Sequence, residues 1–237
     1  MNSSALRLTA IAGLVLVSAS SAFAATYTNV PTGPNTGLPF ASFGNAGNPS
    51  GDSPKVGEVF SLSAGAQLSS FSFYALGNQS LSLQLNVARW NPASNAQNQA
   101  SNGVGPALLT TAAATVGQYN AAGGYTALSF DNLGLNLNAN TKYIAYLSST
   151  DANLTGVQLS RTQTAADSSG FGIGLAYLST TPGSGWQLPF NGNGFLSLQY
   201  SAETVAAPVP EPKTYALLVL GLGLIGVVLK RRKADQA

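Results

Sequence analysis

The chain has 237 residues, of which only 8% are charged, and it contains neither cysteine nor histidine. The absence of both residue types excludes disulfide bonds, a Ser-His-Asp triad, a cysteine nucleophile, and zinc sites with imidazole or thiolate ligands. The formal net charge of +2 is set by basic residues at the two chain ends, because residues 25–208 carry four basic and six acidic side chains. A slightly acidic body offers no basic surface for nucleic acid, so we expect no nucleic-acid partner.

The first 24 residues have the organisation of a secretory signal peptide. Arg7 precedes an apolar run from Ala10 to Val17, and the segment ends in the small-residue sequence Ala22-Phe23-Ala24. The apolar run is too short to cross a hydrocarbon core of roughly 30 Å. We therefore expect residues 1–24 to be a signal peptide that directs export and is removed after Ala24.

The body begins with a lead-in and continues as short strands. Residues 25–55 are rich in Gly, Pro and Asn, which predicts a loop-dominated lead-in, and Asn91 to Gly105 predicts a surface loop. Residues 56–204 contain segments in which apolar and polar residues alternate with the period of two of a half-buried strand. The expected strands are Val56–Leu62, Leu68–Leu76, Leu81–Trp90, Tyr125–Phe130, Lys142–Ser148, Thr155–Arg161, Leu175–Leu178 and Phe195–Ser201. Their spacing predicts an all-β fold, an antiparallel β-sandwich of jelly-roll-like type.

The chain ends in a short apolar segment between a linker and a basic cluster. Residues 205–214 form the linker, which contains a Pro-Glu-Pro sequence, and Tyr215 to Leu229 are fifteen mostly apolar residues. A helix of this length covers about 22 Å, so its interfacial Tyr215 and the basic cluster have to sit among the lipid headgroups to complete a span. We expect a transmembrane helix over residues 215–229 and, by the positive-inside rule, a basic cytoplasmic end over residues 230–237. The Gly-x-Gly-x-x-Gly pattern of residues 221–226 lies in this segment and outside any βαβ unit, so it does not indicate a nucleotide site.

This tail resembles the PEP-CTERM sorting-signal family of Gram-negative bacteria over about Val209 to Lys233. The residues that match the recognition motif and the Arg-rich end are Pro210, Glu211, Pro212, Arg231 and Arg232. The resemblance implies that an exosortase, an integral-membrane protease-like enzyme, recognises and removes the tail. The protein would then be anchored only transiently in the inner membrane before it reaches the cell surface or the extracellular matrix. An ordinary membrane anchor is the alternative.

Carboxylates are the chemistry that remains for a catalytic or metal site. A glycosidase needs only two of them, but four of the six acidic residues of the body lie in turn contexts and the other two lie near its opposite ends. The four in turn contexts are Asp52, Asp131, Asp151 and Asp167, and the two near opposite ends of the body are Glu58 and Glu203. Asp151 and Asp167 could offer oxygen ligands to calcium, yet no EF-hand spacing is present and we expect both to be turn formers. We predict no catalytic residue, no metal ligand and no cofactor.

Neutral polar side chains and a few aromatic residues define the candidate ligand surface. Strand faces rich in Ser, Thr, Asn and Gln suit a hydroxyl-rich polysaccharide, although many exported β-proteins carry such faces without a sugar ligand. Four aromatic residues could form a platform for sugar rings: Trp90, Trp186, Tyr119 and Tyr125. We expect Trp90 to lie in the core. Trp186 lies in a Gly- and Pro-rich segment, where both glycan contact and packing remain open.

The sequence as a whole favours a non-enzymatic exported protein of the cell surface or matrix. It would be sorted by its C-terminal tail, processed by an exosortase-type enzyme, and associated with extracellular exopolysaccharide in a biofilm or floc. Two alternatives are a carbohydrate-active enzyme that uses two carboxylates and a purely structural coat protein.

Overall fold

The structure, a computed structural model, describes residues 24–30, 38–45, 52–78, 80–91, 104–121, 124–162, 170–178, 185–188 and 196–206. All of them belong to one unit, Ala22–Ala207, and they form fifteen β-strands and no helix. Within these ranges there is accordingly no helix with the length and apolarity that a membrane span requires. Residues 1–23 of the expected signal peptide, the Pro-Glu-Pro sequence and the expected helix over residues 215–229 lie outside the described residues.

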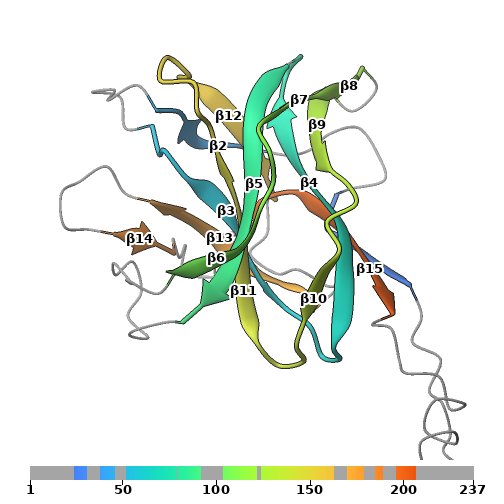
Figure 1. Cartoon of the computed structure of the whole chain (residues 1–237). Coiled ribbons are helices and arrows are strands. Elements are labelled where there is room, and N and C mark those ends of the chain that lie inside the picture. Colours follow the sequence, from blue (N-terminus) through green and yellow to red (C-terminus); the bar gives the residue numbers. More distant parts are fainter. Residues whose placement is uncertain are drawn as a thin grey trace, which may run out of the picture. The chain divides into compact units, whose positions relative to one another are not determined.

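The strands form two antiparallel sheets (Figure 1). Sheet A contains β1 (Ala25–Thr28), β2 (Leu38–Phe43), β4 (Ala66–Leu76), β8 (Gln118–Asn120), β9 (Tyr125–Phe130), β10 (Leu135–Leu137), β12 (Val157–Arg161) and β15 (Tyr200–Ala206). Sheet B contains β3 (Val56–Ser61), β5 (Leu81–Trp90), β6 (Val104–Thr110), β7 (Ala114–Val116), β11 (Lys142–Ser148), β13 (Gly172–Leu178) and β14 (Trp186–Gln187).

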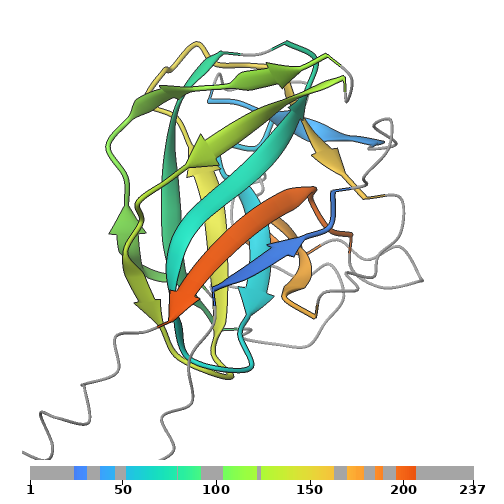
Figure 2. The same ribbon diagram turned by 90° about the vertical axis from the view of Figure 1, so that its right-hand side faces the viewer.

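Strand β4 is the longest strand and organises sheet A. On one edge it pairs with β15 along residues 66–73 and with β12 at Ala75. On the other edge it pairs with β9 along residues 71–76 and with β10 along residues 66–68. Strand β1 adds to the far edge of β15, so β1, β15, β4 and β9 lie side by side in Figure 2. In sheet B the strands follow the order β14-β13-β3-β11-β5-β6, and β7 also pairs with β5.

One apolar core lies between the two sheets and takes side chains from both of them. Phe60 of β3 packs 5.8 Å from Phe71 of β4, between ring centroids, and stacks 4.7 Å from Phe171. Phe71 in turn lies 5.8 Å from Tyr200 of β15. The expected alternation in β5 is confirmed on this side, where Leu83, Leu85 and Val87 are fully buried. Because burial of one such side chain stabilises a fold by roughly 1.5–3 kcal/mol, this core holds the sheets together without disulfide bonds.

A second, smaller apolar cluster covers the outer face of sheet B. Its buried members are Val59, Ala88, Trp90, Ile144, Tyr146, Ala176 and Trp186. Sheet B is therefore apolar on both faces along its centre, whereas the outer face of sheet A carries mostly polar residues. This difference leaves sheet A as the sheet with a polar face toward solvent.

The chain passes from sheet B to sheet A at Gly117. Strand β7 pairs with β5 of sheet B, and β8, which follows after this one residue, pairs with β9 of sheet A. Gly117 has a φ of 141°. Residues that have a Cβ atom rarely adopt a backbone conformation of this kind, whereas glycine adopts it without a steric penalty. The crossing brings β8 next to β9, which lies between β8 and β4 in sheet A.

The prediction of an all-β body with antiparallel sheets is confirmed. Three strands have the same bounds in the structure as in the prediction: Leu81–Trp90, Tyr125–Phe130 and Lys142–Ser148. The expected strand at Phe195–Ser201 is displaced, because β15 begins at Tyr200 and continues to Ala206. The lead-in is not only loop, since it supplies β1 and β2. Of the loop expected at Asn91–Gly105, the last two residues belong to β6, and residues 92–103 lie outside the described residues. These strands are held by partners distant in sequence, which a local pattern does not reveal.

Candidate functional site

The outer face of sheet A places two tyrosines and two amide side chains together. Residues directly opposite each other on neighbouring strands share a face of the sheet. Tyr74 of β4 is opposite Ala127 of β9, which is opposite Gln118 of β8. In the adjacent row, Tyr125 of β9 is opposite Asn120 of β8. The inner face at this level is filled by apolar side chains such as Phe73, so these polar residues belong to the outer face.

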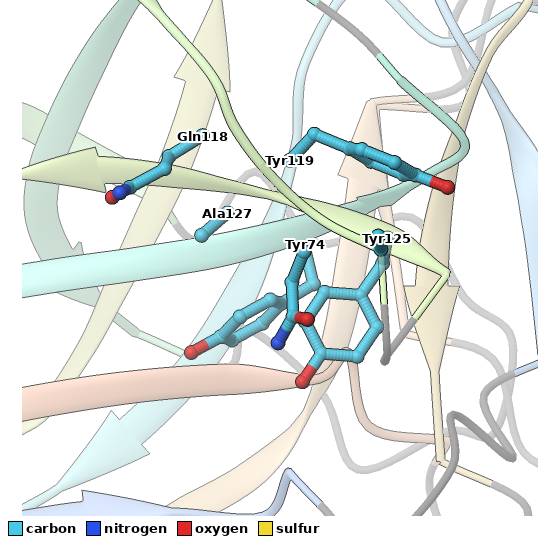
Figure 3. A pocket seen from close by; sticks show the side chains of 7 residues that line it. Tyr74, Gln118, Tyr119, Tyr125 and Ala127 are labelled. Carbon is cyan, nitrogen blue, oxygen red and sulfur yellow. The ribbon is translucent and has the colours of Figure 1, made fainter.

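These residues surround an open hollow of about 510 Å³ (Figure 3). Its lining, which we call the tyrosine hollow, consists of Tyr74, Gln118, Tyr119, Asn120, Ala121, Tyr125 and Ala127. Figure 3 shows the rings of Tyr74 and Tyr125 converging, whereas Tyr119 extends away from them. The two converging rings meet edge to face, with centroids 4.8 Å apart and an interplanar angle of 80°. Tyr125 is only 8% exposed and Tyr119 is 45% exposed, so the hollow has a buried aromatic floor and an exposed aromatic rim.

The hydroxyl group of Tyr74 stays protonated well beyond neutral pH. Burial raises the pKa of Tyr74, and the nearby charge that Tyr125 would carry when ionised raises it further. A hydrogen bond with the Ser201 side chain on β15 lowers this pKa, but the net direction is upward. A neutral phenol both donates and accepts hydrogen bonds, as do the amide side chains of Gln118 and Asn120 taken together. The hollow therefore offers uncharged hydrogen-bonding groups beside aromatic surface.

None of the basic residues in the described ranges lines the tyrosine hollow. Lys55 is next to sheet B, where its Nζ lies 5.6 Å above the centre of the Tyr146 ring. Arg89 and Lys142 belong to strands of sheet B. Arg161 ends β12, where its side chain donates to the Thr162 carbonyl at 3.1 Å. The hollow consequently lacks a cation that could neutralise an acidic ligand.

Trp186, the candidate glycan contact, packs in the cluster on sheet B. Its ring meets that of Tyr146 at 5.2 Å and that of Trp90 at 6.4 Å, both edge to face. Only 7% of Trp186 is exposed, which leaves little ring surface for a sugar. The contacts favour packing over glycan binding for Trp186, and Trp90 is buried, as expected. Of the four aromatic residues, the structure brings Tyr119 and Tyr125 together in the hollow and keeps both tryptophans on the other sheet.

The sequence prediction missed Tyr74 as part of this site. A signal for it was present in the expected strand Leu68–Leu76, where a period of two puts Tyr74 on the face opposite Phe71 and Phe73. Its proximity to Tyr125 depends on the pairing of β4 with β9. That pairing joins residues about fifty positions apart, which the alternation alone does not determine.

The most buried carboxylate, Glu58, serves the fold. It lies on β3 with no exposed surface and points into the space between the sheets, on the same face of β3 as Phe60. Its Oε1 accepts a hydrogen bond from the Ser197 hydroxyl at 2.9 Å, and its Oε2 accepts one from the Leu198 amide at 2.9 Å. Glu58 therefore fixes the segment that leads into β15, and a polymeric substrate could not reach it.

Two of the aspartates hold loops in place. The Asp52 Oδ2 atom accepts hydrogen bonds from the Thr155 hydroxyl at 2.7 Å and the Gly156 amide at 3.0 Å. Asp151 accepts a hydrogen bond from the Asn153 amide at 2.9 Å, which confirms the expected turn. Asp167 lies outside the described residues. Within the described ranges, no three acidic side chains come together as metal ligands.

The comparisons with known proteins concern the C-terminal segment. Residues 208–233 match the family model of the PEP-CTERM protein-sorting motif, which confirms the resemblance proposed for the tail. Searches of curated proteins and of solved structures gave no match. The motif indicates an exported protein that passes through a membrane-anchored sorting step and is processed by an exosortase-type enzyme. By this segment the chain carries the sorting signal of the PEP-CTERM family.

Proposed function

We propose that this protein is a non-enzymatic component of the cell surface or extracellular matrix that binds exopolysaccharide at the tyrosine hollow. In this proposal, a signal peptide (residues 1–24) directs export, and the helix over residues 215–229 holds the protein in the inner membrane until an exosortase-type enzyme removes the tail. The observation that carries the binding role is the group of Tyr74, Tyr125 and two amide side chains on the polar outer face of sheet A.

The chemistry of the hollow suits a sugar. Sugar rings present apolar C–H faces and a rim of hydroxyl groups, and a binding site has to satisfy both. The exposed ring of Tyr119 and the partly exposed ring of Tyr74 supply aromatic surface, and Gln118 and Asn120 supply donors and acceptors. Such a combination of aromatic surface and a few convergent polar groups is the usual composition of a small-ligand site.

The body that presents this hollow is proposed to be a β-sandwich of jelly-roll-like type. The single apolar core that receives side chains from both sheets supports this assignment. In a sandwich the outer face of each sheet is available to ligands without disturbing the core. This separation allows a binding surface on sheet A to vary in sequence while the fold is retained.

Retention on the organism's own exopolysaccharide tests the proposal. Tyr74→Ala and Asn120→Ala should each weaken binding of the secreted protein by about tenfold, which corresponds to roughly 1.4 kcal/mol. Leu108→Ala is the matched control, because Leu108 is an exposed side chain of β6 on sheet B. Binding that both hollow variants retain in full, or a wild-type protein that does not bind, would refute the proposed role. In the second case a purely structural coat protein would be the better description.

The enzyme alternative has a separate test. Incubation of the wild-type protein with the same exopolysaccharide should release no reducing sugar. If the wild-type protein released reducing sugar and a Glu203→Gln variant released none, a carboxylate-dependent enzyme would be the better description of the protein. Glu203 is the residue to change because its side chain is exposed on sheet A.

A further inference from the structure

Four hydroxyl side chains form a row across sheet A. Thr28 of β1 is directly opposite Ser201 of β15, Ser201 is opposite Ser72 of β4, and Ser72 is opposite Ser129 of β9. We call this row the hydroxyl ladder; it runs across the four strands that lie side by side in Figure 2. Since neighbouring strands are about 4.8 Å apart, the ladder crosses roughly 14 Å of the sheet.

The ladder is accessible and adjoins the tyrosine hollow. Thr28 and Ser129 are exposed, and Ser72 and Ser201 are half-buried. The Ser72 hydroxyl donates to the Ser129 hydroxyl oxygen at 2.9 Å, which fixes the end of the row on β4 and β9. Ser72 is two positions before Tyr74 on β4, so the two side chains share a face and the ladder is the row next to the hollow. A serine or threonine hydroxyl has one donor and two acceptor positions. Thr28 uses its donor on the Tyr200 carbonyl at 3.0 Å and one acceptor position on the Val30 amide at 3.2 Å, so one acceptor position there remains for a ligand.

The charges around the ladder point to an uncharged partner. Glu203 is opposite Thr26 on β1 and Ser70 on β4, in the row next to the ladder, and it is exposed. The described basic residues lie on or beside sheet B, except Arg161 at the end of β12. The four strands that carry the ladder, β1, β15, β4 and β9, contain no basic residue. An acidic polymer lying across them would therefore be repelled by the carboxylate of Glu203, whereas a neutral polymer would not.

From the ladder and the hollow together we infer the ligand class and its orientation. The ligand is an uncharged polysaccharide chain that crosses the strands of sheet A, with one sugar in the tyrosine hollow and the following sugars over the hydroxyl ladder. The length of a pyranose unit is close to the distance between strands, so successive sugars meet successive hydroxyl groups. This inference rests on the proposed function and adds to it the neutrality, the extended length and the direction of the bound chain.

Fractionation of the organism's exopolysaccharide provides the test. Anion exchange separates neutral from acidic polysaccharide, and partial hydrolysis of the neutral fraction gives oligosaccharides of increasing length. We expect the wild-type protein to bind the neutral fraction, with an affinity that rises with chain length until the ligand covers the ladder. The double variant S72A/S129A, which changes two ladder residues that do not line the hollow, should lose this rise, a loss of about tenfold for long chains, and should bind the shortest oligosaccharides like the wild type. Ser82→Ala, an exposed serine on β5 of sheet B, is the control that should change nothing.

The possible results distinguish failure of this inference from failure of the proposed function. If S72A/S129A keeps the full dependence on chain length, or if the acidic fraction binds better than the neutral one, the inference is refuted while polysaccharide binding stands. If neither fraction binds to the wild-type protein, the proposed function itself is refuted. Circular dichroism of the double variant checks that it folds, since removal of two hydroxyl groups from an outer face should not cause misfolding.

Discussion

Ala25 lies directly opposite Thr204, so the first described strand and the last are antiparallel neighbours in sheet A. The Thr204 hydroxyl donates to the Ala25 carbonyl at 3.4 Å. Ala25 is also the residue that follows the expected signal-peptide cleavage site. A peptidase has to bind the residues on both sides of the bond it cuts, so Ala25 cannot be paired with Thr204 at that moment. We therefore expect β1 to join the sheet only after the signal peptide is removed.

The contribution of β1 to stability can be measured at Tyr27. Its ring stacks on Phe171 with centroids 4.5 Å apart and an interplanar angle of 18°. Tyr27→Ala removes this contact from a partly exposed position, so the free energy of unfolding of the mature protein should fall by about 2 kcal/mol. Urea denaturation measures the change. Thr26→Ala, an exposed neighbour on the same strand, should shift it by less than about 0.5 kcal/mol. Equal effects of the two substitutions would show that β1 is not docked as described.

Glu58 gives a prediction about the core between the sheets. Glu58→Leu removes the acceptor of the Ser197 hydroxyl and the Leu198 amide, and both donors lie in a buried region. The Ser197 hydroxyl keeps the Leu198 carbonyl as an acceptor at 3.1 Å, but the buried Leu198 amide loses its acceptor. We expect a loss of about 1–3 kcal/mol, because a buried donor without an acceptor retains its full desolvation cost. Glu58→Gln keeps the volume and one acceptor oxygen, so its loss should be smaller. Thermal or urea unfolding measures the stability of both variants. A Glu58→Leu protein as stable as the wild type would contradict the prediction.

The sequence predicted what depends on local alternation and missed what depends on partners distant in sequence. The strand Leu81–Trp90 was predictable because its inward leucines and valine repeat every second residue over a long segment. Strand β1 has only four residues and persists because β15, more than 170 positions later, pairs with it. The hollow combines both cases. Tyr119 and Tyr125 were candidates by composition, but Tyr74 joins them only through the register between β4 and β9.

Trp186 was ambiguous for a related reason. A tryptophan in a Gly- and Pro-rich segment can be exposed or can fold back onto a sheet, and the sequence does not say which. Its contact with Tyr146 depends on the pairing of β14 with β13, which places Trp186 opposite Leu178. The outer face of sheet B is apolar at this point, so the hydrophobic effect favours the packed arrangement.

Replacement of Trp186 separates its packing role from glycan contact. Trp186→Ala should lower the free energy of unfolding by about 3 kcal/mol, because a large buried ring leaves a cavity against Tyr146 and Trp90. Retention of the folded variant on exopolysaccharide should equal that of the wild type. Trp186→Phe keeps an aromatic ring and should lose less stability. A folded Trp186→Ala protein with weakened retention would restore Trp186 as a glycan contact.

The pH dependence of stability should report on Tyr74. The pKa of Tyr74 is raised in the folded protein, so above about pH 10 the unfolded chain loses a proton that the folded protein retains. The free energy of unfolding should therefore be independent of this group below that pH and should fall as the pH rises above it. Tyr74→Phe removes the titrating hydroxyl and should flatten part of the decline in urea unfolding between pH 9 and pH 11. Tyr146 contributes in the same direction through burial, so some decline should remain.

The sorting motif predicts the ends of the mature protein. Strand β15 ends at Ala206, and the matched motif begins at residue 208, so cleavage close to Pro210-Glu211-Pro212 would leave sheet A intact. Mass spectrometry of the surface or extracellular fraction should find an N-terminus at Ala25 and a C-terminus near the Pro-Glu-Pro sequence. Glu211→Ala should leave the tail attached and the protein in the membrane fraction, whereas Glu203→Gln, a change outside the motif, should be processed normally. Full-length chain in the outer fraction of the wild-type strain would contradict processing at the motif. Because β15 is the central neighbour of both β4 and β1, cleavage upstream of Ala206 would also destabilise sheet A, so a stable mature protein requires the cut to fall after this strand.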